Sequence, residues 1–192
     1  MASLRGMSAP ATTDPELDGV TWDLSHLLDG ASEADASAAV DGLLASSRER
    51  AEAFAERYRG KLGDLDAAGL AAAMREIETI EDAIGRAYTY ASLSFSTNTA
   101  DPPRGALIQR VTEQATDIST LLVFWDLEWA AVPDETADAL LASGELDFAK
   151  HHLAAARRYR PHLLSEAEEQ LMSEKAVTGS HAWDRLFEEQ TS

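Results

Sequence analysis

The sequence predicts an all-α fold: an elongated antiparallel helical bundle built on a long two-helix hairpin. Apolar residues recur every three or four positions through two long stretches, at about residues 66–100 and 102–132. Proline or glycine stands at the ends of the periodic stretches, where helices stop. No segment has the alternating apolar and polar residues of a convincing strand.

The first predicted helix follows Gly30, with Ser32 as a candidate N-cap, and ends at Gly60. The helix that begins near Asp66 has apolar positions spaced alternately by four and three residues, interrupted by one acid, Glu81. The positions of this seam are Leu70, Met74, Ile77, Glu81, Ile84, Tyr88, Ala91 and Phe95. The pattern predicts that this face packs against the next helix.

The third predicted helix begins at Asp101-Pro102-Pro103, where a cap is followed by proline in the first turn. It repeats the seam and closes at Pro133. A short turn between two long helices predicts an antiparallel hairpin, in which facing residue numbers sum to roughly 202. This register predicts contact between Arg75 and Glu128.

Shorter helices are predicted beyond the hairpin, over about 134–142, 146–160 and from Ser165 onward. Ser165 and Glu168 have the spacing of a capping box, and a last helix follows Thr178-Gly179. Residues 1–21 have no periodicity and are predicted to be a flexible lead-in. Residues 22–192 are predicted to form a single helical domain.

Charge and composition exclude several classes of protein. The chain has 34 acidic against 16 basic residues, a net charge of -18 that argues against a nucleic-acid partner. No cysteine is present to form a disulfide or a thiolate site. The longest uncharged run, residues 87–100, is too short to span a bilayer, so no membrane partner is expected. These features predict a cytoplasmic protein.

The sequence lacks the short motifs of common catalytic sites. It contains no H-E-x-x-H, no Glu-x-x-His, no G-x-S-x-G, no Walker A motif and no G-x-G-x-x-G. We therefore assign no catalytic, metal-binding or cofactor-binding residue in this chain. The acidic cluster Glu78, Glu81 and Asp82 admits a metal or catalytic carboxylate, but one buried acid with a polar partner is favoured. The aromatic residues Tyr88, Phe95, Phe124, Trp125 and Trp129 are expected to pack in the core.

The one basic stretch, residues 150–162, stands out in an acidic chain. It can contact an anionic group of a substrate or of another domain. The candidate contact residues are Arg157, Arg158, Arg160 and His162. The alternative is structural, with these arginines paired to the Glu-rich helix that follows. A metal site from the histidines of this stretch is disfavoured, because the adjacent His151 and His152 point to different faces of a helix.

A series of short motifs occurs in a characteristic order along the chain. It runs from Trp22-Asp23-Leu24 through Tyr58-Arg59-Gly60-Lys61-Leu62, Tyr90-Ala91-Ser92-Leu93, Asn98-Thr99-Ala100-Asp101 and Leu127-Glu128-Trp129. It continues with Arg157-Arg158-Tyr159-Arg160-Pro161-His162, Glu174-Lys175, Thr178-Gly179 and Ala182-Trp183-Asp184-Arg185-Leu186-Phe187. Together these motifs resemble the N-terminal region of the oligoendopeptidase F family of zinc metallopeptidases, relatives of thimet oligopeptidase.

The resemblance implies a mostly helical cytoplasmic peptidase that hydrolyses short oligopeptides. In that family an H-E-x-x-H helix and a downstream Glu bind zinc, and the N-terminal helices cover a deep substrate channel. This chain stops at Ser192, before those residues. We therefore expect the zinc in a catalytic domain absent from this chain, and expect the chain alone to be inactive.

The implied N-terminal domain should bear a sizeable apolar patch where the catalytic domain would pack. The alternative is a free-standing helical module that binds a peptide or a partner protein. Such a module should have a closed, polar surface apart from one groove.

Overall fold

The computed structural model describes residues 22–191, and within this range it contains helices and no strands. The α-helices are α1 (Ala36–Tyr58), α2 (Ala67–Thr97), α3 (Pro102–Ala131), α4 (Asp134–Leu141), α5 (Lys150–Arg158), α6 (Glu166–Thr178) and α7 (Ser180–Thr191). Short 3₁₀ turns are η1 (Ser25–Leu28), η2 (Leu62–Asp64), η3 (Gly144–Leu146) and η4 (Arg160–His162). The predicted all-α class and long hairpin are confirmed. The predicted lead-in, residues 1–21, lies outside the described residues.

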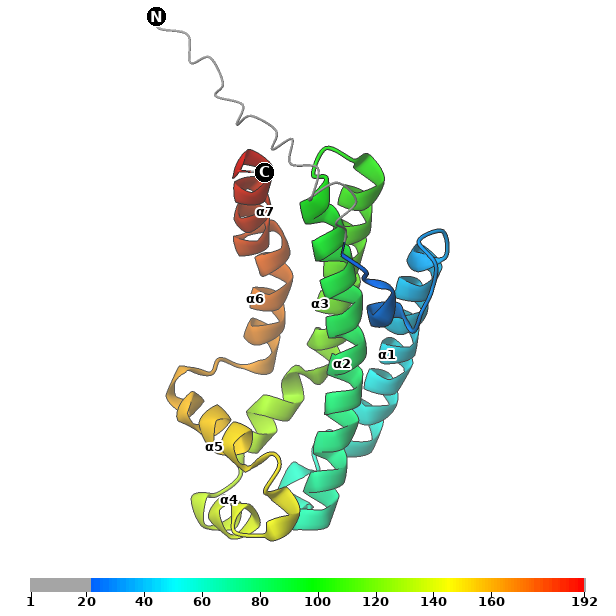
Figure 1. Ribbon diagram of the computed structural model, residues 1–192. Helices are drawn as coiled ribbons and strands as arrows, with labels where there is room; N and C mark the ends of the chain where they lie inside the picture. The colour runs from blue at the N-terminus through cyan, green and yellow to red at the C-terminus, as the bar shows by residue number, and fades with distance from the viewer. Residues whose placement is uncertain (1–21, 192) are drawn as a thin grey trace, which may run out of the picture.

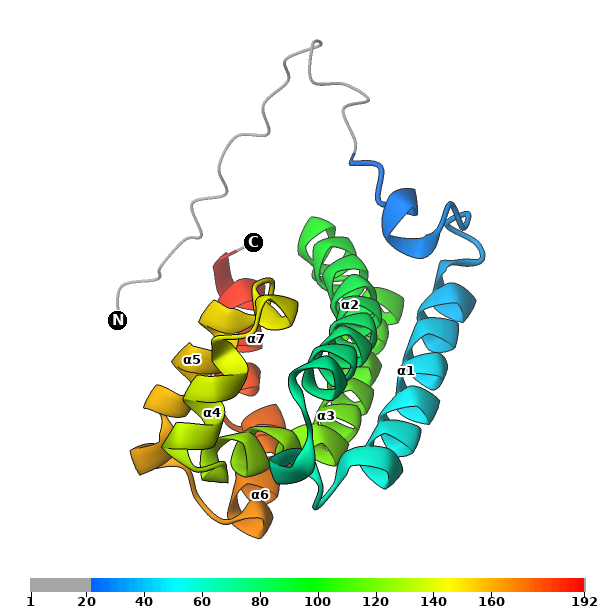
Figure 2. The same cartoon turned by 90° about the horizontal axis from the view of Figure 1, so that it is seen from below.

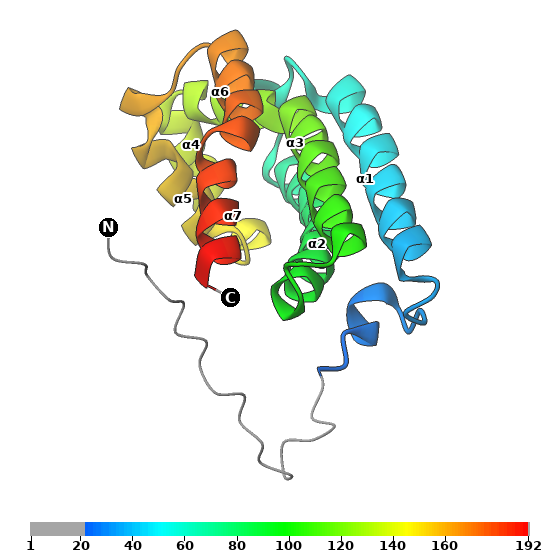
Figure 3. The ribbon, with the colours of Figure 1, turned by 90° about the horizontal axis from the view of Figure 1, so that it is seen from above.

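The helices are arranged around the α2–α3 hairpin (Figure 1). Helix α1 covers one side of the hairpin, and the four shorter helices α4–α7 lie on the opposite side (Figure 2). Seen from the other end, α6 and α7 follow one another alongside the hairpin (Figure 3). The hairpin is therefore the central layer, covered on both sides.

Local capping explains where two of these helices begin. At the start of α2, the Asp66 carboxylate accepts the backbone N–H of Gly69 at 2.7 Å. At the start of α6, Ser165 and Glu168 form the predicted capping box, in which each side chain bonds the backbone of the other residue. These caps satisfy N–H groups that have no partner inside the helix.

The buried stripe of α2 differs by one residue from the predicted seam in its middle section. It passes through Ile80 and Ala87, both 0% exposed, rather than through Glu81 and Tyr88. The stripe is rotated because α1 and α3 both pack on α2, so the inward direction lies between these two neighbours. The prediction that Glu81 is a buried acid is therefore wrong, and Tyr88 is half-exposed.

An aromatic group joins α1 to the C-terminal half of α3. The ring of Phe54 lies 6.1 Å from that of Phe124 and 5.3 Å from that of Trp125. Tyr58, one turn after Phe54, contacts Phe54 at 4.6 Å and Trp125 at 6.5 Å between ring centroids. Phe124, Trp125, Trp129 and Phe95 are all buried, as core packing predicted.

Helices α1 and α3 run parallel and are joined by two reciprocal ion pairs. Arg48 of α1 bonds Asp117 of α3 at 3.0 Å, and Arg110 of α3 bonds Asp41 of α1 at 3.1 Å. Both pairs join residues that are 69 positions apart. In the first pair α1 supplies the base and α3 the acid, and in the second pair α1 supplies the acid and α3 the base.

The connection between α1 and α2 is held by Glu128 of α3. Its carboxylate accepts the backbone N–H of Gly60 at 2.6 Å and that of Leu62 at 3.4 Å. Gly60 has a φ of 76°, a left-handed conformation that favours glycine. The predicted contact between Arg75 and Glu128 is therefore wrong: the turn occupies the carboxylate, and Arg75 lies over the ring of Phe148 at 4.0 Å.

Candidate functional site

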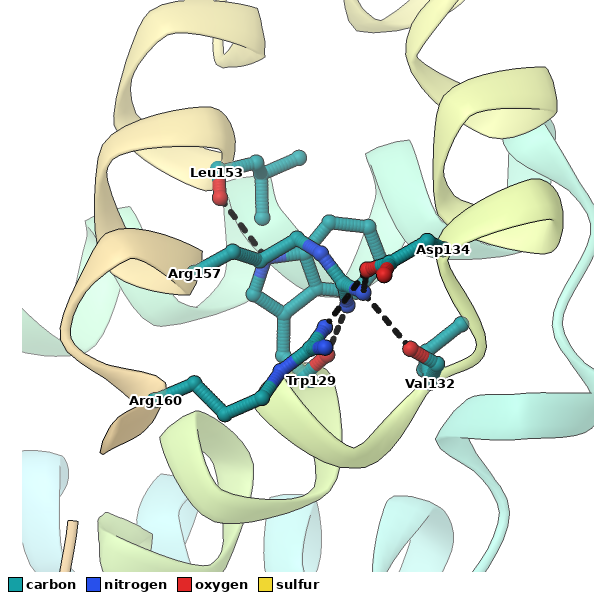
Figure 4. Close-up of polar contacts among 6 residues, drawn as sticks. All are labelled: Trp129, Val132, Asp134, Leu153, Arg157 and Arg160. Atoms are coloured by element: carbon teal, nitrogen blue, oxygen red, sulfur yellow. Dashed lines mark hydrogen bonds and ion pairs between the residues drawn. The ribbon is translucent and has the colours of Figure 1, made fainter. Parts of the chain in front are cut away.

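The basic segment forms a joint between α3, α4 and α5 (Figure 4). The guanidinium of Arg157 donates to the carbonyl oxygens of Trp129 at 2.6 Å and Val132 at 2.7 Å, and to Asp134 at 2.6 Å. Arg160 donates to the same Asp134 carboxylate at 2.9 Å. The Arg157 side chain is only 11% exposed. Two of the four predicted contact residues therefore hold the fold together.

The position of Arg157 follows from how α3 ends. The last carbonyl groups of a helix have no partner within it and carry partial negative charge. Arg157 supplies donors to two carbonyls at this end, and its charge lies 5.2 Å from the Trp129 ring. Asp134 accepts hydrogen bonds from Arg157 and Arg160, and the Arg157 bond has the larger effect on its pKa. These bonds, together with the positive charges of the two arginines, hold the pKa of Asp134 below its usual value.

The predicted alternative gave these arginines the wrong partner. They pair with Asp134, in the first turn of α4, and not with the Glu-rich start of α6. Glu166 of α6 instead forms an ion pair with Arg59, just beyond α1. Neither Asp134 nor Arg59 has a sequence signal that identifies its partner, because both contacts depend on how distant helices pack.

The other two candidates, Arg158 and His162, are exposed. Within residues 22–191 neither side chain forms a hydrogen bond or an ion pair. His151 and His152 are exposed as well, and no three His, Asp or Glu side chains of the described range are grouped to hold a metal ion. Of the four candidate contact residues, Arg158 and His162 therefore remain available for contact.

We predict that Arg157→Ala lowers the free energy of unfolding by about 1–3 kcal/mol, because it leaves partly buried carbonyls without donors. Arg158→Ala, one residue away and without a partner, should change it by less than about 0.5 kcal/mol. Urea denaturation followed by circular dichroism measures both values. Equal losses from the two substitutions would contradict the structural role given to Arg157.

Glu81 of α2 and Asp126 of α3 lie close enough for their charges to interact. Desolvation by the surrounding helices raises the pKa of both carboxyl groups, although both side chains reach solvent. The Asp126 charge raises the pKa of Glu81 further, and His152 of α5 opposes the rise for both. Asp82, the third acid of the predicted cluster, lies 4.0 Å from Arg86.

Helices α6 and α7 present an apolar surface to solvent. No residue of either helix is buried. The large apolar side chains that they expose away from the groove described below, called the outer apolar surface, are Leu171, Met172, Trp183 and Phe187. Trp183 and Phe187 are 71% and 68% exposed and lie one helical turn apart. A surface of this kind is typical of a site where another protein surface packs.

A groove of about 620 Å³ lies between the hairpin and the α6–α7 pair. Its walls are formed by α2 and α3 on one side and by the C-terminal end of α6 and α7 on the other. Apolar lining residues include Phe95, Ile108, Val177 and Leu186, and Arg185 and His181 are among the polar ones.

None of the described helices is long and apolar enough to cross a membrane.

Two comparisons with known proteins agree with the predicted resemblance. Residues 128–192 match the model of the family described as Oligopeptidase F. Over 126 residues the chain is 29% identical to a protein of Bacillus subtilis (strain 168) named Oligopeptidase PepF. This alignment covers 65% of the present chain and 19% of the Bacillus protein. The chain thus spans about a fifth of this relative. No solved structure matches the chain significantly. The resemblance to the N-terminal region of the oligoendopeptidase F family is confirmed.

Proposed function

We propose that this chain is the N-terminal helical region of an oligopeptidase F-like zinc metallopeptidase that hydrolyses short oligopeptides in the cytoplasm. In this proposal the helices help to form the substrate channel, and a catalytic domain that follows residue 192 supplies the zinc site and the water-activating base. The chain by itself has no peptidase activity. The proposal extends to this chain the activity that the name of the matched family, Oligopeptidase F, implies.

The proposal rests on the position of the outer apolar surface, which lies within the part of the chain that matches the family. The family match covers residues 128–192, and the outer apolar surface of α6 and α7 lies inside this range. Burial of one large apolar side chain contributes about 1.5–3 kcal/mol. Four such side chains on two consecutive helices favour a partner surface over an isolated surface. The proposed partner is the catalytic domain of the same polypeptide.

Arg158 and His162 are the candidate contacts with that domain or with the substrate. Both are exposed, both lie in the matched region, and neither is used by the fold within the described residues. In a chain of net charge -18 the Arg158 guanidinium is a local positive charge for a peptide carboxylate, and the His162 ring is a hydrogen-bonding group beside it. Arg157 and Arg160 contribute indirectly, because their bonds to Asp134 fix the backbone of this segment.

The alternative, a free-standing helical interaction module, has one observation in its favour, the groove beside α7. It also requires a polar surface elsewhere, since a stable monomer rarely exposes a large apolar patch. The outer apolar surface contrasts with this requirement. We therefore prefer the peptidase proposal.

Reading the gene beyond codon 192 tests the proposal directly. An open frame that continues into an H-E-x-x-H motif with a downstream Glu is expected. The full-length protein should then cleave a quenched fluorescent oligopeptide, and chelation of its metal should abolish cleavage. Purified residues 1–192 should not cleave the same peptide, with or without added zinc.

Two results would contradict the proposal. A stop codon directly after Ser192 favours the interaction module instead. Zinc-dependent cleavage by purified residues 1–192 shows that the chain does not need a separate catalytic domain.

In the full-length protein, Phe187→Glu should lower the melting temperature if the outer apolar surface is covered, and Glu49→Gln on exposed α1 surface serves as the matched control.

A further inference from the structure

Helix α7 is attached to the molecule differently from α6. The α6 helix packs along α3, with side chains such as Glu169, Gln170 and Ser173 partly buried. In α7 the side chain of Arg185 alone is partly buried, and every other described residue of the helix is exposed. Figure 3 shows α7 continuing from α6 alongside the end of the hairpin. No described side chain of α7 is buried, so contacts at the surface of the helix hold it in position.

Arg185 links α7 to both arms of the hairpin. Its Nη1 donates to the Oε1 atom of Gln109 in α3 at 3.3 Å, and its guanidinium lies 5.5 Å from the ring centroid of Phe95 in α2. The guanidinium also fills space beside Gly105, where a Cβ atom would lie 3.4 Å from Nη2. Glu189, one turn further along α7, bonds Nε at 2.8 Å and orients the side chain. Through these contacts Arg185 holds α7 against the end of the hairpin, and we call this set of contacts the latch.

Gly179 separates α6 from α7. Its φ of -100° and ψ of -106° are not helical, so the two helices are joined at a single residue. A Cβ atom at this position would lie 2.9 Å from the carbonyl oxygen of Lys175, closer than real Cβ contacts. Any other residue would therefore require the backbone to shift. Glycine is therefore the residue that fits the junction between α6 and α7 without a shift of the backbone.

The groove of about 620 Å³ lies between α7 and the hairpin, and α7 supplies many of its lining residues, among them His181, Arg185 and Leu186. A movement of α7 about Gly179 changes the width of this groove and leaves the α3–α6 packing in place. We propose that α7 is a lid over the groove, hinged at Gly179 and latched to the hairpin by Arg185.

Hydrogen exchange on the full 192-residue chain, read by mass spectrometry, tests the lid. In Arg185→Ala the amides of residues 180–191 should exchange about tenfold faster, because a hydrogen bond and a cation–π contact are lost. Residues 36–58 and 102–131 should be unchanged. Arg158→Ala, which removes an exposed arginine without a side-chain partner, is the matched control and should leave all rates unchanged.

A distance measurement gives a second readout. The chain has no cysteine, so spin labels can be placed at Thr89→Cys on α2 and Gln190→Cys on α7. Their distance distribution should be narrow with Arg185 present and broad in Arg185→Ala. Labels at Thr89→Cys and Glu49→Cys on α1 should give the same narrow distribution in both backgrounds.

Three outcomes would overturn the proposal. Unchanged exchange of residues 180–191 in Arg185→Ala removes the latch. Faster exchange that extends equally through residues 166–178 removes the hinge, because α6 and α7 then open together. Residues 180–191 that already exchange without protection in the unaltered chain show that no closed lid exists.

Discussion

Replacing Trp129 by Ala is expected to lower the free energy of unfolding by about 3–5 kcal/mol, the usual range for truncating a large buried aromatic side chain. Trp129 is 1% exposed at the C-terminal end of α3. Its indole N–H donates to the carbonyl oxygen of Leu153 in α5 at 2.8 Å, and Arg157 lies over its ring (Figure 4). The substitution therefore creates a cavity and removes the anchor that α5 has on α3.

Two controls separate these contributions. Trp129→Phe keeps most of the volume and removes the hydrogen-bond donor, so it should cost about 1–3 kcal/mol. Trp183→Ala removes an exposed tryptophan and should change the stability of residues 1–192 by less than about 0.5 kcal/mol. Urea denaturation followed by circular dichroism avoids the loss of a tryptophan signal. Losses of similar size from Trp129→Ala and Trp183→Ala would contradict the packing described for α3 and α5.

Replacing Phe54 by Ala is expected to cost about 3–5 kcal/mol as well. Phe54 is 0% exposed and contacts Tyr58, Phe124 and Trp125, so its ring lies at the centre of the aromatic group between α1 and α3. Each aromatic pair adds about 0.5–1.5 kcal/mol beyond the burial of its surface. The loss should therefore fall near the upper end of the range for a phenylalanine.

Phe187→Ala is the matched control, since Phe187 is an exposed phenylalanine of the same chain. In residues 1–192 this substitution should change the free energy of unfolding by less than about 0.5 kcal/mol. Hydrogen exchange adds a spatial test: in Phe54→Ala protection should fall most in α1. A cost below about 1 kcal/mol for Phe54→Ala would show that α1 does not rest on this aromatic group.

The helices of this protein could be predicted because their signals are local. Periodic apolar residues located α2 and α3, Asp66 marked the start of α2, and Ser165 with Glu168 marked the start of α6. Each signal involves residues within a few positions of one another, where helical geometry is fixed. The buried stripe of α2 does not follow from local signals, because the neighbours α1 and α3 together decide which side of the helix faces inward.

The partners of the polar residues could not be predicted in this way. Arg157 bonds Asp134 and the end of α3, and Glu128 bonds the turn that contains Gly60. These contacts join segments far apart in the sequence, and several acids of an acidic chain could have satisfied each arginine. The same reasoning explains why Arg185 was not identified as a link to Gln109.

The two ion pairs between α1 and α3 have a consequence for alternative packings of the bundle. Helices with a seven-residue repeat can slide by one heptad and still match apolar residues to apolar residues. Here Asp41 and Arg48 on α1 are spaced as Arg110 and Asp117 are on α3, with the signs reversed. A slide in one direction brings Asp41 opposite Asp117, and a slide in the other brings Arg48 opposite Arg110. Either shifted packing places like charges together, so the reciprocal pairs select the native alignment even where each exposed pair contributes little to stability.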